Sequence, residues 1–219
     1  MTEATDHVAQ AARLVVENGA VYTRTGGDPF FFSSGWASPI FIDVKRLISM
    51  PMARDQLVRM ALERLGERFR EEPMDFVAGC ELAGVPFAAI VADRLKRPLV
   101  IVRKQGKGFG RLAQFEGTFD PDTRALLIDD LSTDGVNKSA FRAALERAEA
   151  KVVETFVFMD YRVFPAARPV MSLMTLNDII IAAESLGRLG GRELAEVKAF
   201  AADAPAWSRR NGGIAALPR

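Results

Sequence analysis

The stretch ALLIDDLSTDGVN, residues 125–137, runs from four apolar residues into two acids, small hydroxylated residues, a glycine and a predicted helix. A short apolar run of this kind is typical of a strand buried on both faces. Small residues and a glycine at a helix N-terminus let backbone N–H groups converge on an anion, assisted by the helix dipole. This stretch therefore predicts a strand–loop–helix unit with a phosphate site in its loop.

The adjacent acids Asp129 and Asp130 need a partner other than phosphate, because two carboxylates repel an anion. A ribose diol fits, since it donates hydrogen bonds. An acidic turn that only caps the helix is the simpler alternative, and the spacing up to Asp134 also resembles a calcium loop. A calcium loop of the EF-hand type needs a helix on both sides, whereas here an apolar strand precedes it. These residues alone leave ribose-phosphate binding and a capping turn open.

The regions on either side repeat the same alternation. Further apolar runs and helical stretches follow one another at 76–78, 85–95, 99–102, 138–150 and 152–159. This order predicts an α/β fold with an open, mostly parallel sheet flanked by helices. We expect a single domain over 1–219, with a small N-terminal lobe at about 19–50, a core at about 74–175 and a C-terminal helical segment at about 176–219.

Composition excludes several classes of function. With 29 basic and 28 acidic residues the net charge is +1, which gives no reason to expect nucleic acid as a partner. The single cysteine, Cys80, and the single histidine, His7, argue against a disulfide, a zinc site and a Ser–His–Asp or Cys–His group. No apolar run has membrane-spanning length and no signal core is found, so we expect a cytoplasmic protein without a membrane partner.

Two more strand-following loops are candidates for anion binding. Residues 103–111 hold four cations and three glycines, which suits a mobile cationic loop over an anion or, alternatively, a solvated hairpin tip. Residues 79–86 form a Gly-flanked turn that enters a helix, so its backbone N–H groups suit a pyrophosphate. A plain strand–helix connector is the alternative for the second loop.

These motifs resemble known ones. Residues 126–137 look like the phosphoribosyl pyrophosphate (PRPP) motif of type I phosphoribosyltransferases. The order Arg-Lys-x-x-Lys-x-aromatic-Gly from Arg103, followed by Glu-Gly-Thr at 116–118, resembles the catalytic loop of the orotate phosphoribosyltransferases. The Ser-Gly-x-x-Ser-Pro stretch at 34–39 resembles the hood that closes over the base in that family. The resemblance extends from about Gly19 to Gly213.

The resemblance implies roles for individual residues. Asp129 and Asp130 bind the ribose hydroxyls, and Lys107 is the principal catalytic lysine. The implied PRPP contacts are Arg103, Lys104, Lys107, Phe109, Asp129, Asp130, Leu131, Ser132, Thr133, Asp134, Gly135, Val136 and Asn137. The implied orotate contacts are Phe41, Thr133, Tyr161 and Arg162.

The same resemblance implies the reaction and its partners. Ribose 5-phosphate passes from PRPP to orotate, giving orotidine 5′-monophosphate and pyrophosphate in de novo pyrimidine biosynthesis. Mg²⁺ is the expected cofactor, carried by PRPP rather than by protein ligands. The catalytic loop acts in trans, on the neighbouring subunit's active site, so we expect a homodimer.

This chain departs from the family pattern near the base. Ser33 and Leu82-Ala83 replace a lysine and a Tyr-Lys pair, Phe109 replaces a histidine, and Tyr161 stands where an arginine often contacts orotate. The residues that read the orotate carboxylate therefore stay open. Two alternatives also remain: a phosphoribosyltransferase for another base, and a non-catalytic regulator of this fold that senses PRPP or nucleotides.

Overall fold

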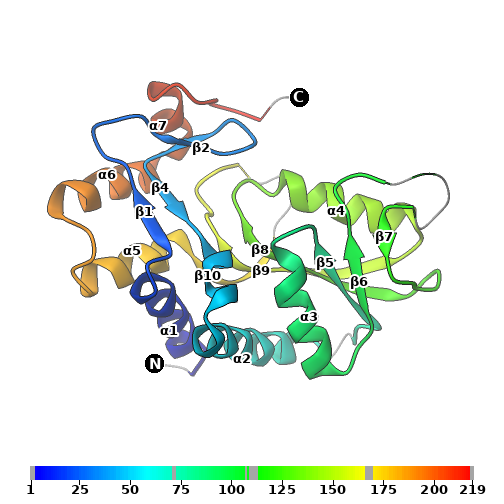
Figure 1. The fold of residues 1–219 in the computed structure, drawn as a ribbon. Coiled ribbons are helices and arrows are strands. Elements are labelled where there is room, and N and C mark those ends of the chain that lie inside the picture. Colours follow the sequence, from blue (N-terminus) through cyan, green and yellow to red (C-terminus); the bar gives the residue numbers. More distant parts are fainter. Residues whose placement is uncertain (1–2, 71–72, 107, 109–112, 166–169, 218–219) are drawn as a thin grey trace.

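A computed structural model describes residues 3–70, 73–106, 108, 113–165 and 170–217. Within these residues a six-stranded sheet forms the centre of the molecule (Figure 1). From one edge to the other its strands are β10 (Met171–Thr175), β9 (Lys151–Asp160), β8 (Arg124–Ser132), β5 (Phe76–Cys80), β6 (Leu99–Val102) and β7 (Phe115–Glu116). All neighbouring strands are parallel except β7, which runs antiparallel to β6. The predicted fold class, an open and mostly parallel α/β sheet, is confirmed.

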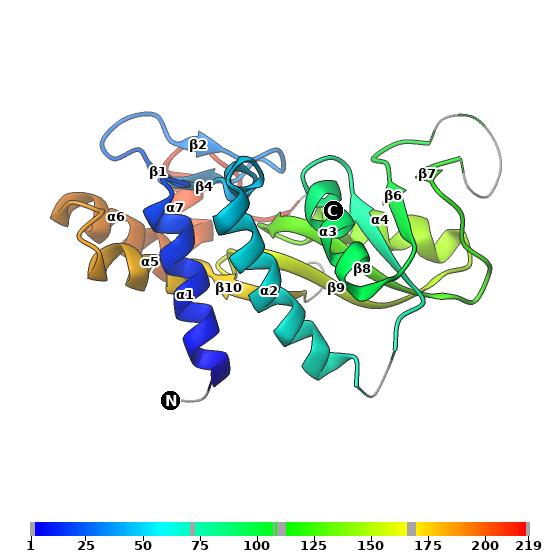
Figure 2. The same ribbon diagram turned by 60° about the horizontal axis from the view of Figure 1, so that its bottom comes forward.

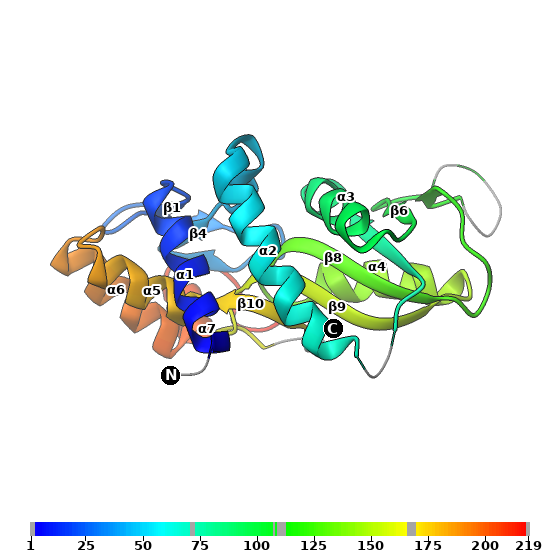
Figure 3. The same cartoon turned by 90° about the horizontal axis from the view of Figure 1, so that it is seen from below.

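Helices cover both faces of the sheet. α2 (Pro51–Arg68) and α3 (Gly84–Leu95) lie over one face, and α4 (Val136–Arg147) lies over the other, as the views in Figures 1 and 3 show. Because side chains alternate along a strand, neighbouring residues serve different faces. In β5, Phe76, Ala78 and Cys80 join the apolar cluster under α4, while Val77 joins the cluster under α3. The same alternation in β8 decides where its acids point.

A small lobe precedes the sheet in the chain. Two antiparallel pairs form it: β1 (Val21–Thr23) with β4 (Ile40–Ile42), and β2 (Phe30–Phe31) with β3 (Ala37–Ser38). A 3-10 helix, η1 (Val44–Ser49), leads from it into α2. The lobe also rests on the other end of the chain. Helices α5 (Leu176–Ser185), α6 (Gly191–Ala202) and α7 (Ala204–Arg210) gather beside it in Figure 1, and α1 (Glu3–Glu17) lies next to α2 in Figure 2.

Two hydrogen bonds fix the lobe to the C-terminal segment, and a third, between Ser208 and Ile214, lies within that segment. Ala37 N donates to Ser208 Oγ (3.0 Å), Ser208 Oγ donates to Ile214 O (2.7 Å), and Ile214 N donates to Gly35 O (3.1 Å). Ser208 is fully buried. The lobe is therefore a composite of the two ends of the chain rather than an N-terminal unit alone.

Most predicted elements are present with shifted ends. The predicted strand at 125–128 continues to Ser132 as β8, so the two acids lie inside the strand and not after it. β10 was not predicted, and the predicted helical segment at about 176–219 contains three helices, α5, α6 and α7, the first two of which are separated at Gly187 and Gly190. Along the described part of the chain, no helix is long and apolar enough to cross a membrane.

Candidate active site

A cavity of about 360 Å³ opens where the parallel strands end, next to the lobe. Ligands of open parallel sheets bind at this edge because the strand-following loops meet there. The loops after β5 and β8 both line the cavity, and Phe41 of β4 closes it from the lobe side. Two loops and a strand that are far apart in the sequence therefore share one site.

The acids of β8 form the base of this cavity. Asp129 and Asp130 have only 6% and 8% of their surface exposed. Asp129 shares a strand face with Leu127 and therefore points toward α4, where Lys138 Nζ lies 2.5 Å from its Oδ2. Its Oδ1 accepts a hydrogen bond from Asp130 N (2.9 Å). We call Asp129, Asp130 and Lys138 the acidic floor.

The two carboxyl groups of the acidic floor have different electrostatic surroundings. Burial lowers the pKa of Lys138, but Asp129 and the other nearby negative groups more than offset this, so the net shift is upward. Burial, followed by the charge of Asp129, raises the pKa of Asp130 to about 7. One carboxylate is thus neutralised by a lysine that sequence reasoning missed, and the other holds a proton near neutral pH.

Cys80 lies against the floor but is not a nucleophile. Burial raises the pKa of its thiol well above the usual range, and the neighbouring Asp129 carboxylate adds to the shift. The thiol therefore stays protonated, and the cysteine packs as a small apolar residue of β5.

The start of α3 is held unusually close to the floor by Gly84. A methyl group at this position would lie 2.6 Å from Ile128 O and 2.8 Å from Asp129 Oδ1. Only a residue without a Cβ atom allows the helix to begin so near the end of β8. The turn that precedes it, residues 81–83, consequently lines the cavity opposite the loop after β8.

The loop between β8 and α4 has the form of an anion cradle. Gly135 is the N-cap of α4 with φ of 77°, a left-handed conformation that favours glycine. Asp134 does not face the anion position with a free carboxylate: its Oδ1 accepts from Val136 N (3.0 Å) and its Oδ2 accepts from Trp36 Nε1 (3.1 Å). Trp36 is fully buried in the lobe, so Asp134 connects the cradle to the lobe.

The predicted cationic loop begins beside the turn at 81–83. Glu81 Oε2 accepts a hydrogen bond from Lys104 N (2.8 Å), and Lys104 lines the cavity. Arg103 pairs instead with Glu116, its Nε lying 2.7 Å from Oε1. Lys107 and Phe109, the other predicted residues of this loop, lie outside the described residues.

The lobe supplies an aromatic side to the cavity. Phe31, Phe32 and Phe41 line it, and Phe41 contacts Phe32 with ring centroids 6.4 Å apart. Lys45 of η1 also lines the cavity, with its Nζ 5.3 Å from the centroid of Phe41. We call Phe31, Phe32, Phe41 and Lys45 the aromatic wall.

The two other predicted base contacts lie elsewhere. Tyr161 is 1% exposed, and its hydroxyl accepts from Ile42 N (3.1 Å) in the lobe. Arg162 turns toward Asp160 (3.3 Å) and Ser172 Oγ (3.2 Å). Neither lines the cavity, and Val136 is likewise absent from its lining, whereas Leu131, Ser132, Thr133 and Asn137 are part of it.

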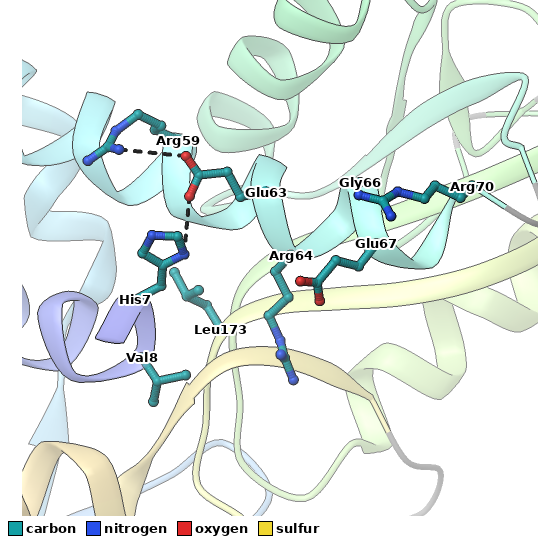
Figure 4. Close-up of a pocket in the computed structure, with 9 residues that line it drawn as sticks. All are labelled: His7, Val8, Arg59, Glu63, Arg64, Gly66, Glu67, Arg70 and Leu173. Carbon is teal, nitrogen blue, oxygen red and sulfur yellow. Dashed lines mark ion pairs between the residues drawn. The ribbon is translucent and has the colours of Figure 1, made fainter. Parts of the chain in front are cut away.

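A second cavity, of about 560 Å³, lies between α1 and α2 and is drawn in Figure 4. Several of its charged side chains are engaged with one another or with the backbone: Glu63 contacts both His7 (3.1 Å) and Arg59 (3.6 Å), and Arg64 Nε donates to Ser172 O (2.9 Å). It includes none of the strand-end loops. The cavity over the acidic floor therefore remains the candidate active site.

Comparison with known proteins agrees with this location. The phosphoribosyl transferase domain family matches residues 50–174, which include the floor and the loops after β5 and β8. The orotate phosphoribosyltransferase of Sinorhizobium medicae is 39% identical over 94% of this chain and 92% of its own length.

The chain belongs to the orotate phosphoribosyltransferase family.

Solved structures share its fold. An orotate phosphoribosyltransferase from Aeropyrum pernix superposes with a TM-score of 0.66 at 29% identity, covering 82% of this chain and 99% of that one. A UMP synthase from Leishmania donovani has a TM-score of 0.75 at 24% identity. It covers 89% of this chain, which spans only 42% of that protein.

Proposed function

We propose that this chain transfers ribose 5-phosphate from PRPP to orotate, releasing pyrophosphate and giving orotidine 5′-monophosphate. The observation that carries the proposal is the acidic floor at the head of an anion cradle, in a chain of this family. Lys138 neutralises Asp129, so a floor of two acids can lie beneath a highly charged sugar phosphate without a net charge of −2. This resolves the repulsion that the acid pair alone would cause.

In this proposal each part of the cavity holds one part of the donor. The 5-phosphate lies in the cradle at 131–137, where Gly135 and the dipole of α4 favour an anion. The ribose hydroxyls donate to Asp129 and Asp130. The pyrophosphate lies between the turn at 81–83 and Lys104. The base lies against the aromatic wall, because flat rings stack favourably on Phe side chains.

The reaction needs no protein nucleophile. The bond from the anomeric carbon to the pyrophosphate oxygen breaks, the bond from that carbon to a ring nitrogen of orotate forms, and the proton of that nitrogen is released. The carbon acquires positive charge in the transition state, and the carboxylate of Asp130, when ionised, would stabilise that charge. The protein contributes by orienting both reactants and by placing charge where it develops.

Mg²⁺ is assigned to the oxygens of PRPP. Among the described residues, no group of three or more His, Cys, Asp or Glu side chains could hold a metal ion. The carboxylates of the floor fit an ion that the substrate brings, because they face the ribose end of the cavity. Such an ion supplies charge neutralisation on the pyrophosphate as it leaves.

Lys107 is assigned as the catalytic lysine on the family resemblance, acting on the neighbouring subunit's cavity in a homodimer. We expect Lys107→Ala to lower kcat by about 10²–10³, equivalent to about 2–4 kcal/mol, because the lysine meets charge that grows on the leaving group. Steady-state kinetics would measure this, with the KM for PRPP changing much less. An unchanged kcat would refute the role.

A cytoplasmic location is supported by Cys80, which is a free thiol. The proposed function itself is tested by mixing the protein with Mg²⁺, PRPP and orotate and following the loss of orotate absorbance. Parallel reactions with hypoxanthine and adenine test the alternative that another base is the acceptor. Absence of turnover with every base would favour a regulator that only binds PRPP or nucleotides.

A further inference from the structure

The orotate carboxylate needs a cation in the cavity, and the described residues offer few. Only three described cations line it: Lys45, Lys104 and Lys138. Lys138 is buried against Asp129 and is committed to the floor. Lys104 lies in the loop after β6, where its backbone N donates a hydrogen bond to Glu81. That leaves the lysine of the aromatic wall.

Lys45 is built to meet a flat anion. Its Nζ lies over the ring of Phe41 at 5.3 Å from the centroid, and both side chains line the cavity, so the ammonium group and the ring are available to the same ligand. Asp43 Oδ1 accepts from the same Nζ at 2.6 Å. An ammonium group has three donors, so this bond fixes the position of Lys45 and leaves donors for a ligand.

The Lys45–Asp43 pair is also accessible, unlike the floor. The side chain of Lys45 is 47% exposed. An ammonium group that is this exposed can exchange water for a ligand carboxylate at little cost. The floor lysine, by contrast, could not leave Asp129 without stranding a buried carboxylate.

We propose that Lys45 is the residue that reads the carboxylate of orotate, and so distinguishes orotate from uracil, which lacks that group. This inference rests on the proposed function. It also accounts for Ser33 and Tyr161, which stand where the family pattern has basic residues, because Lys45 of η1 supplies the cation instead.

The test uses the full-length protein and two acceptor-site ligands. Lys45→Met is compared with the wild type for the KM of orotate, the KM of PRPP and inhibition by uracil. We expect the KM for orotate to rise at least 30-fold, while the KM for PRPP and the inhibition constant of uracil change less than about 3-fold. Lys45→Arg keeps the charge and should recover most of the affinity for orotate.

Lys96→Met is the matched control, because it removes an exposed lysine that pairs with Asp93 (3.0 Å) outside the cavity. It should leave all three constants unchanged. The inference is overturned if Lys45→Met keeps the wild-type KM for orotate, or if it weakens orotate and uracil equally, which would indicate a purely structural role. Absence of orotate turnover by the wild type would instead contradict the proposed function.

Discussion

The acidic floor and the aromatic wall line the same cavity but differ in how deeply they are buried and in how their charged groups are paired. The floor is almost completely buried, and its one lysine is bound to a carboxylate at 2.5 Å. The wall is partly exposed, and its lysine keeps donors free. Buried charges need a partner within the protein even without a ligand. Exposed charges are solvated by water and can pair with a ligand when it binds.

This difference separates stability from specificity. Changing the floor should alter the free energy of unfolding and the binding of PRPP, because its groups support one another. Changing the wall should alter the choice of base and leave the fold intact. Each of the following changes tests that division, and the expected effects decrease from one to the next.

The largest effect is expected from Lys138→Met. It removes the partner of a buried carboxylate, which typically costs about 3–5 kcal/mol of unfolding free energy. Urea unfolding at pH 7.5 would measure this loss. The control is Lys151→Met, which breaks an exposed pair with Asp122 (2.8 Å) and should cost far less than Lys138→Met. Similar losses in the two variants would mean that burial does not distinguish the floor.

Gly84→Ala should follow, with a loss of about 2–3 kcal/mol, because the added methyl group meets Ile128 O and Asp129 Oδ1 well inside contact distance. The KM for PRPP should rise as the turn at 81–83 shifts. Gly66→Ala in α2 is the matched control. It has open space around it and should stabilise the protein by about 0.5–1 kcal/mol. Thermal unfolding of both variants decides, and a neutral Gly84→Ala would show that the close approach is not required.

Asp130→Asn should stabilise the protein above pH 7 and impair it as a catalyst. The pKa of Asp130 is raised to about 7 in the fold, so its protonated form is the favoured one. Its contribution to stability is complete below about pH 4 and is lost as the pH rises to about 7. The neutral amide removes that loss, so the variant should be more stable than the wild type at pH 8.

Urea unfolding of the wild type and Asp130→Asn across pH 4–8 would show the difference growing with pH. The KM for PRPP should rise about 10-fold in the variant, because an amide is a poorer acceptor for the ribose hydroxyls than a carboxylate. A pH-independent difference in stability would contradict the raised pKa.

The smallest effect is expected from Phe41→Leu in the wall. Loss of the ring removes stacking worth about 1 kcal/mol, so the KM for orotate should rise about 5-fold while stability and the KM for PRPP stay near wild type. Uracil inhibition should weaken by the same factor, in contrast to Lys45→Met. Weakening of orotate alone would assign Phe41 a part in reading the carboxylate.

The sequence was sufficient for the fold class and for the loop at 131–137, because both depend on local patterns. Apolar runs predict buried strands, and Gly135 before a helix predicts the cradle. The strand at 99–102 has the predicted bounds. The fold class and this loop therefore depend on residues that are close together in the sequence.

What the sequence could not predict depends on contacts between distant elements. β8 extends through Asp129 and Asp130 because Lys138 compensates a charge that would otherwise end a buried strand. The one available signal was a lysine in the first turn of the following helix. Lys45 was harder to predict as a residue of the cavity, because its distance from the cavity depends on how the lobe folds back over the sheet.

The hydrogen bonds from Ser208 and Ile214 to the lobe set an order of assembly for the growing polypeptide. During synthesis, the sheet strands and the loop before α4 leave the ribosome tens of residues before the segment that binds the lobe. A nascent chain therefore completes the acidic floor and the loop before α4 first, and the lobe that carries the aromatic wall receives the support of Ser208 and Ile214 only later.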